Sequence, residues 1–234
     1  MNVLTGVGIL LLSMLIVAFL QLCPSILMIF LHYCHAKYSK LRTSDLTLFY
    51  IFGVEVFVAL VFVLLYYIAT IGLSFLPNDA SSTVFYILSA ILLIIGICFP
   101  FLYFRRGDGT RLFISRKIAD NFTSSIKKTK RRSDAFMLGF SAGMPELILT
   151  VPLYLLCTMV IVDLGEAPIT RAAMILLFVI VTILPLFVIR FLFSRHFNLA
   201  NIQMFRERNK KFFGFLIGIL YILVAITVFL RVNG

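Results

Sequence analysis

Two carboxylates stand inside long apolar stretches of the sequence, where ionisable groups are rare. Glu55 follows Asp45 by ten residues, and Glu146 follows Asp134 by twelve. At the rise of an α-helix these separations correspond to about 15 and 18 Å, near the middle of a hydrocarbon core about 30 Å thick. Arg190 lies near the end of its own stretch and offers no obvious ion pair. An unpaired carboxylate in lipid is costly, so we expect at least one of the two to take up and release protons.

Small and polar residues lie at helical spacing from Glu146. Gly139, Gly143, Glu146 and Thr150 fall on one stripe of a helix, and glycines there let another helix approach closely. Prolines interrupt two of the stretches and free backbone carbonyls one turn earlier, which are potential cation ligands. The residues expected to line an ion or substrate pathway are Gln21, Pro24, Ser25, Glu55, Gly143, Pro145, Glu146 and Thr150.

A purely structural role for the carboxylates is the alternative interpretation. Glu55 and Glu146 would then bond to Gln21, Ser25, Thr150 or a backbone carbonyl and hold the helices together. His32, Cys34 and His35 lie close in sequence but lack a fourth ligand, so we expect no metal site and no cofactor.

The surrounding composition is that of a membrane protein. Of the 234 residues, 62% are hydrophobic and only 13% are charged, too apolar a mixture to fold as a soluble domain. Six apolar stretches are each long enough to be read as a transmembrane helix. They comprise residues 3–33, 46–73, 84–104, 135–162, 169–193 and 212–232. We therefore expect an all-α, multi-pass protein of the cell (inner or cytoplasmic) membrane.

The net charge of +11 is unevenly distributed among the connections between these stretches. Bases are concentrated after the first, third and fifth stretches, and ten Lys or Arg residues lie between Arg105 and Arg132. By the positive-inside rule these connections are cytoplasmic, which places both termini outside. The charge therefore indicates topology, and we expect no nucleic-acid partner.

The long basic connection also carries an amphipathic pattern. Ile114, Ile118, Phe122 and Ile126 recur at every fourth residue among bases. This pattern is typical of a helix that lies in the membrane interface. It predicts either a binding face for anionic lipid or a cytoplasmic anchor that also fixes topology.

The two halves of the chain share a pattern. When Pro24 is aligned with Pro145, each half has three apolar stretches with a proline in the first. Three is an odd number, so the halves would be inverted in the membrane, as in many secondary transporters. The organisation expected is a first repeat at 1–104, a basic cytoplasmic loop at 105–134 and a second repeat at 135–234.

The six stretches, the two prolines and the segment from Phe136 to Pro145 resemble the superfamily that includes the LysE lysine exporters and the CcdA and DsbD thiol electron transporters. The resemblance implies an exporter of a small solute or cation. The segment Leu22-Cys23-Pro24 is similar to the first-span motif of the electron transporters, which implies a redox cysteine and a thioredoxin-like partner. The second redox cysteine of those proteins is missing here, because Met144 and Glu146 flank Pro145.

The sequence is therefore compatible with two main functions and with a third that is less favoured. The first is a proton-coupled secondary transporter, compatible with a homo-oligomer. The second is a thiol electron carrier that uses Cys23 with Cys98 or Cys157. The third is a lipid-binding or assembly protein that acts through the basic loop. The chain has no nucleotide-binding loop, zinc-protease motif or hydrolase serine motif, so we do not expect an enzyme.

Overall fold

A computed structural model describes residues 3–20, 23–75, 78–103, 116–164, 167–194 and 210–233, and these residues are helical almost throughout, with no strand among them. The elements are α1 (Val3–Leu20), α2 (Cys23–Lys37), α3 (Lys40–Phe75), α4 (Asn78–Tyr103), α5 (Arg116–Lys128), α6 (Arg132–Ala142), the 3-10 turn η1 (Met144–Glu146), α7 (Leu147–Leu164), α8 (Pro168–Ser194) and α10 (Lys210–Asn233). The predicted all-α class is confirmed.

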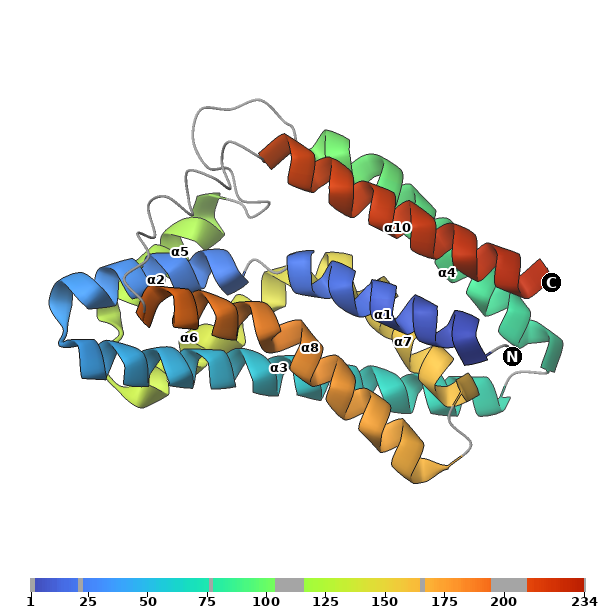
Figure 1. Ribbon diagram of the computed structural model, residues 1–234, viewed down its shortest axis with the longest axis horizontal. Coiled ribbons are helices and arrows are strands. Elements are labelled where there is room, and N and C mark those ends of the chain that lie inside the picture. Colours follow the sequence, from blue (N-terminus) through green and yellow to red (C-terminus); the bar gives the residue numbers. More distant parts are fainter. Residues whose placement is uncertain are drawn as a thin grey trace.

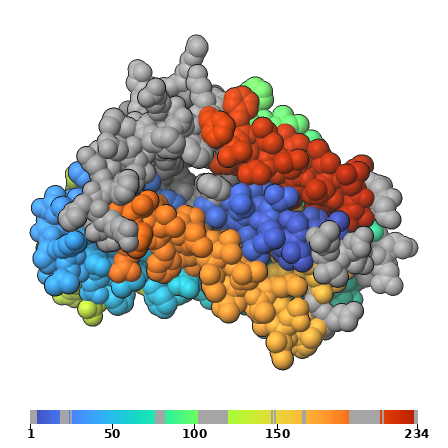
Figure 2. Space-filling model, in the orientation of Figure 1, coloured from blue at the N-terminus to red at the C-terminus, as the bar shows by residue number. Residues whose placement is uncertain are grey.

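Among the described residues, four helices are long and apolar enough to cross a membrane. They contain the candidate spans Lys40–Phe75, Ser82–Phe101, Pro168–Leu192 and Gly214–Arg231, in α3, α4, α8 and α10. Many large apolar side chains on these helices are exposed, as expected for lipid-facing surfaces. Figure 2 shows part of this surface, where α8, α1 and α10 lie side by side on one face. These features suggest a membrane protein.

The fourth apolar stretch is divided in the structure into α6, η1 and α7. The described residues of the first stretch are those of α1 and α2. Pro145 lies within η1 and has no N–H to continue the hydrogen-bond ladder, so the helix is interrupted around it. The apolar parts of α1 and α7 are correspondingly short, at Thr5–Ala18 and Leu149–Leu164.

α3 and α6 run parallel and touch through their backbones. A Cβ atom added to Gly139 would overlap the carbonyl oxygen of Tyr50, and one added to Gly53 would overlap the carbonyl oxygen of Phe136. Each glycine therefore makes room for the main chain of the other helix. The close helix approach expected at the Gly139 stripe is present, with α3 as the neighbour.

α4 and α10 form a second close pair, antiparallel, which lies along one side of the bundle (Figure 1). A Cβ atom on Gly96 would lie 2.9 Å from the carbonyl oxygen of Gly218, and one on Gly218 would lie 2.8 Å from that of Gly96. The buried Ser89 hydroxyl donates a hydrogen bond to the carbonyl of Ala225 over 2.8 Å. The two helices are thus matched along most of their length.

Contacts between the two halves occur largely in corresponding pairs. α1 contacts α8 and α6 contacts α3, while α2 contacts α8 and α7 contacts α3. α1 also contacts α7, and α2 contacts α6. Two contacts, of α10 with α1 and of α4 with α7, do not correspond to each other when the helices of one half are exchanged for those of the other.

Polar contacts are concentrated at the two ends of the bundle. At the end where α1 begins and α10 finishes, Arg231 pairs with Asp163 of α7. At the opposite end, near α5 (Figure 1), Arg132 pairs with Asp45 over 2.7 Å and Arg190 donates to the Ser44 hydroxyl over 3.0 Å. Arg190 is therefore engaged at the basic end of the bundle.

Hydrogen bonds hold the basic segment 127–132 against the end of α2 and the turn that follows it. Tyr33 and Tyr38 donate hydrogen bonds to the carbonyls of Lys127 and Thr129, over 3.1 and 3.2 Å. Both hydroxyl groups therefore bind the protein's own backbone. The Asp134 carboxylate accepts the N–H groups of Arg131 and Lys130, which lowers the pKa of Asp134 and caps α6.

α5 uses part of its apolar side to pack on the protein. Ile126 is buried, and Phe122 packs against the core, where α5 contacts α2 and α6. At this end of the helix the apolar side therefore faces the protein. The hydrogen-bonded segment 127–132 holds the C-terminus of α5 against the bundle, which explains why Ile126 is buried. Ile114 lies outside the described residues, as does the side chain of Ile118.

Candidate ion and substrate pathway

Glu55 lies on the side of α3 that faces α7 and α8. It is partly buried and shares a side of the helix with Phe62, seven residues further on. Phe62 contacts Tyr154 of α7 with ring centroids 5.9 Å apart, and it stacks on Phe178 of α8 at 4.0 Å. The carboxylate is thus turned toward the neighbouring helices of the second half of the chain.

Glu146 ends the turn that interrupts the fourth stretch. Its side chain is outside the described part of the structure, but its backbone is placed by η1. A Cβ atom on Gly143 would overlap the Phe57 ring, so the turn begins directly against α3, two residues from Glu55. The Gly143 N–H donates to the carbonyl of Ser141, so this carbonyl, one turn before Pro145, has a partner.

The register of the helices brings the predicted site residues to one level of the bundle. Phe62 of α3 contacts Tyr154 of α7. Seven residues before this contact lie Glu55 in α3 and Leu147 in α7, so Glu55 is at the level of Leu147 and its neighbour Glu146. Phe30 of α2 stacks on Tyr50 at 5.7 Å. Because α2 and α3 are antiparallel, Ser25, five residues before Phe30, lies at the level of Glu55, five residues after Tyr50. Spans one, two and four therefore contribute to a single layer, called the carboxylate layer below.

Other members of the predicted site are placed as follows. Thr150 is 1% exposed and shares a side of α7 with Tyr154, four residues away. Pro24 is partly buried in the first turn of α2. Gln21 and the side chain of Ser25 lie outside the described residues.

α8 contributes two residues to the carboxylate layer that sequence reasoning did not assign to it. Thr182 and Pro185 lie four and seven residues after Phe178, on the same side of α8 and toward the level of Glu55. The Thr182 hydroxyl is buried and donates to the Val179 carbonyl over 2.9 Å, which leaves its oxygen free to accept a bond. The signal in the sequence was only a threonine and a proline within an apolar run, which is common in membrane helices.

The cysteines show no redox pair among those whose side chains the structure describes. Cys34, Cys98 and Cys157 are all unpaired, with Cys98 exposed on α4 and Cys157 buried in α7. The side chain of Cys23 lies outside the described residues. By the register above, Cys23 is level with Leu149, so Cys157 is about 12 Å away along the bundle. A disulfide allows Cα atoms to be only about 7 Å apart.

Metal ligands are also dispersed within the described part of the chain. No group of three or more His, Cys, Asp or Glu side chains is placed to hold a metal ion there. His32 and His35 are exposed on α2, while Cys34 between them points into the core.

Cys34 is expected to react slowly with alkylating reagents and only at high pH. Burial raises the pKa of the thiol to about 11, and nearby Lys37 opposes this only weakly. The reactive thiolate is therefore scarce at neutral pH, and its fraction grows about tenfold per pH unit up to the pKa. In a variant with Cys34 as its only cysteine, the rate of modification by methyl methanethiosulfonate should still be rising between about pH 9 and pH 10. A rate that levels off near pH 9, as it should after unfolding in detergent, would show that the thiol is not buried.

Comparison with known proteins adds no relative, since no family model, curated protein or solved structure matches the chain.

Proposed function

We propose that the protein is a secondary transporter of the cell membrane that exports a small solute or cation, coupled to protons through Glu55 and Glu146. The observation that carries the proposal is the interruption of the fourth stretch at Gly143–Glu146, directly against α3 and level with Glu55. Two carboxylate positions at one level, beside an interrupted helix, are the features that alternating-access carriers use to bind ions.

An inverted repeat of three plus three spans is part of the proposal. The correspondence of α1, α2, α3 and α4 with α6, α7, α8 and α10 is supported by the paired contacts between the halves. It is also supported by the position of the carboxylate layer, which lies where the interrupted stretch of the second half meets α3 of the first half. Both termini are outside in this arrangement, and the basic end near α5 is cytoplasmic.

Proton coupling can be tested with purified protein in liposomes that contain the pH-sensitive dye pyranine. A pH gradient is imposed, and L-lysine, K⁺ and Mn²⁺ are added in turn as probes of an organic cation, a monovalent ion and a divalent ion. We expect at least one probe to accelerate proton movement relative to liposomes without protein. If none of the three changes proton movement, the proposed coupling is wrong for these cargo classes. Trapping of Cys23 in a mixed disulfide with a thioredoxin-like protein would favour electron transfer instead.

A further inference from the structure

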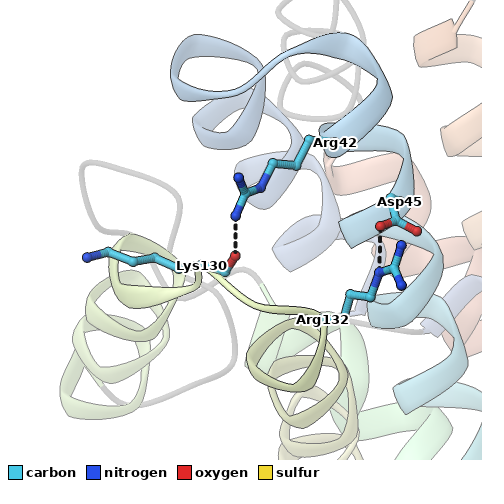
Figure 3. Close-up of polar contacts among 4 residues, drawn as sticks. All are labelled: Arg42, Asp45, Lys130 and Arg132. Carbon is cyan, nitrogen blue, oxygen red and sulfur yellow. Dashed lines mark hydrogen bonds and ion pairs between the residues drawn. The ribbon is translucent and has the colours of Figure 1, made fainter.

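A basic pocket lies at the start of α3, away from the carboxylate layer. It is a cavity of about 560 Å³ lined by Leu41, Arg42, Asp45, Leu46, Lys130, Arg131 and Arg132. Figure 3 shows the guanidinium groups of Arg42 and Arg132 in the space between α3 and the 130–132 segment. The ammonium group of Lys130 points away from both, so Lys130 contributes its backbone to the pocket (Figure 3).

Arg42 and Arg132 are held in place by hydrogen bonds and keep further N–H donors. Arg42 uses one Nη2 hydrogen bond, to the Lys130 carbonyl at 3.1 Å, and Arg132 uses Nε, to Asp45 at 2.7 Å. A guanidinium has five N–H donors, so each arginine keeps donors for a further acceptor. Three arginines and one carboxylate line the pocket, which gives it a positive charge and favours an anion. Arginine side chains suit phosphate oxygens in particular.

The pocket lies at the level expected for phospholipid headgroups. Arg42 and Asp45 lie in the turn just before the apolar part of α3, which is the level of phospholipid headgroups. Leu41, Leu48 and Phe52 share a stripe of α3 with Asp45 and are all exposed, and Leu41 is 86% exposed. Met137 on the adjacent α6 is exposed as well. An exposed apolar track therefore runs from the pocket along α3 into the membrane, beside α6.

We propose that this pocket binds the phosphodiester headgroup of an anionic phospholipid, with one acyl chain lying along Leu48, Phe52 and Met137. The proposal uses only the membrane setting of the chain and does not depend on transport. The occupant is a lipid rather than a free phosphate because the apolar track is continuous with the basic pocket. The fastening of the 127–132 segment by Tyr33 and Tyr38 fixes the pocket before any lipid arrives, which reduces the entropy lost on binding.

Retention of lipid by the full-length protein tests the proposal. Purified protein is titrated with phosphatidylglycerol or phosphatidylcholine in mixed detergent micelles, and bound lipid is counted by native mass spectrometry. We expect phosphatidylglycerol to bind more tightly, and the double variant Arg42→Gln/Arg131→Gln to bind it about tenfold more weakly. A matched control is Lys210→Gln/Lys211→Gln, which removes the same charge at the start of α10, outside the pocket lining, and should bind as the wild type does.

Three outcomes would overturn the proposal. Equal loss in both double variants would mean that general charge, not the pocket, holds the lipid. Equal protection by inorganic phosphate and by phosphatidylglycerol in a thermal unfolding assay would mean that the acyl chain adds nothing. No preference for phosphatidylglycerol over phosphatidylcholine would remove the role of the arginines. If Arg42→Gln/Arg131→Gln does not fold, Met137→Ser, which alters only the apolar track, should still weaken binding, and unchanged binding there would contradict the track.

Discussion

Gly139→Ala is expected to prevent normal assembly of the helix bundle, with a loss of about 3 kcal/mol or more in the free energy of unfolding. The added methyl group would overlap the carbonyl oxygen of Tyr50, which belongs to the main chain of α3. A side chain could rotate away from such a clash, but a backbone cannot, so α3 and α6 must separate. The α3 residues packed against α6 would then lose contact. Stability can be measured by thermal unfolding of the purified protein in detergent, followed by circular dichroism.

Gly72→Ala provides the matched control, because it makes the same chemical change within the same bundle. Nothing lies within 4 Å of the position that its Cβ atom would take on α3. Alanine is favoured over glycine inside a helix by about 0.5–1 kcal/mol, so this variant should be unchanged or slightly more stable. Gly53→Ala should resemble Gly139→Ala, since its methyl group would overlap the carbonyl of Phe136. Similar stabilities for Gly139→Ala and Gly72→Ala would contradict the backbone contact.

Glu55→Gln is expected to reduce cargo-driven proton movement by about a hundredfold or more while leaving the fold intact. Glutamine keeps the size and hydrogen-bonding capacity of the side chain but cannot exchange a proton. Because Glu55 is only partly buried in α3, the substitution leaves the packing of Phe62 on Phe178 unchanged. Proton movement is followed with pyranine-loaded proteoliposomes, and thermal unfolding of the same preparation reports the fold.

The outcome also separates the functional role of the carboxylates from a structural one. A carboxylate that only holds helices together should, when replaced by glutamine, change the unfolding temperature more than the pH dependence of transport. Asp120→Asn on α5 is the matched control, because Asp120 is an exposed acid outside the carboxylate layer. Proton movement in Glu55→Gln that equals that of Asp120→Asn would rule out Glu55 as the coupling residue. Glu146→Gln, tested in the same assay, shows whether the two acids act together.

Much of the architecture could be predicted from residue patterns alone. Apolar runs of this length have few stable alternatives to helices, and Pro145 marked the stretch that is divided in the structure. The Gly139 stripe also predicted a close neighbour correctly, because only a small residue lets two helix backbones meet. These features depend on spacing within one segment, which a sequence displays directly.

The contacts between distant segments could not be predicted in this way. Tyr33 and Tyr38 look like interfacial tyrosines, and nothing in their local sequence indicates hydrogen bonds to carbonyls about ninety residues away. Thr182 likewise joins the carboxylate layer only because α8 runs antiparallel to α3, a relation set by tertiary packing. The amphipathic pattern of α5 predicted an apolar side correctly, but the pattern alone cannot distinguish lipid from protein as the surface that covers it.

The glycine pairs also determine where the molecule is stiff. In α3 with α6, and in α4 with α10, main chain meets main chain, and neither helix of a pair can slide or roll past its partner without collision. Each pair therefore moves as one piece. Contacts such as Phe62 with Phe178 join helices through side chains, which can repack when helices shift. Any opening of the bundle would consequently divide it between the two stiff pieces, with α1, α7 and α8 as the surfaces that slide.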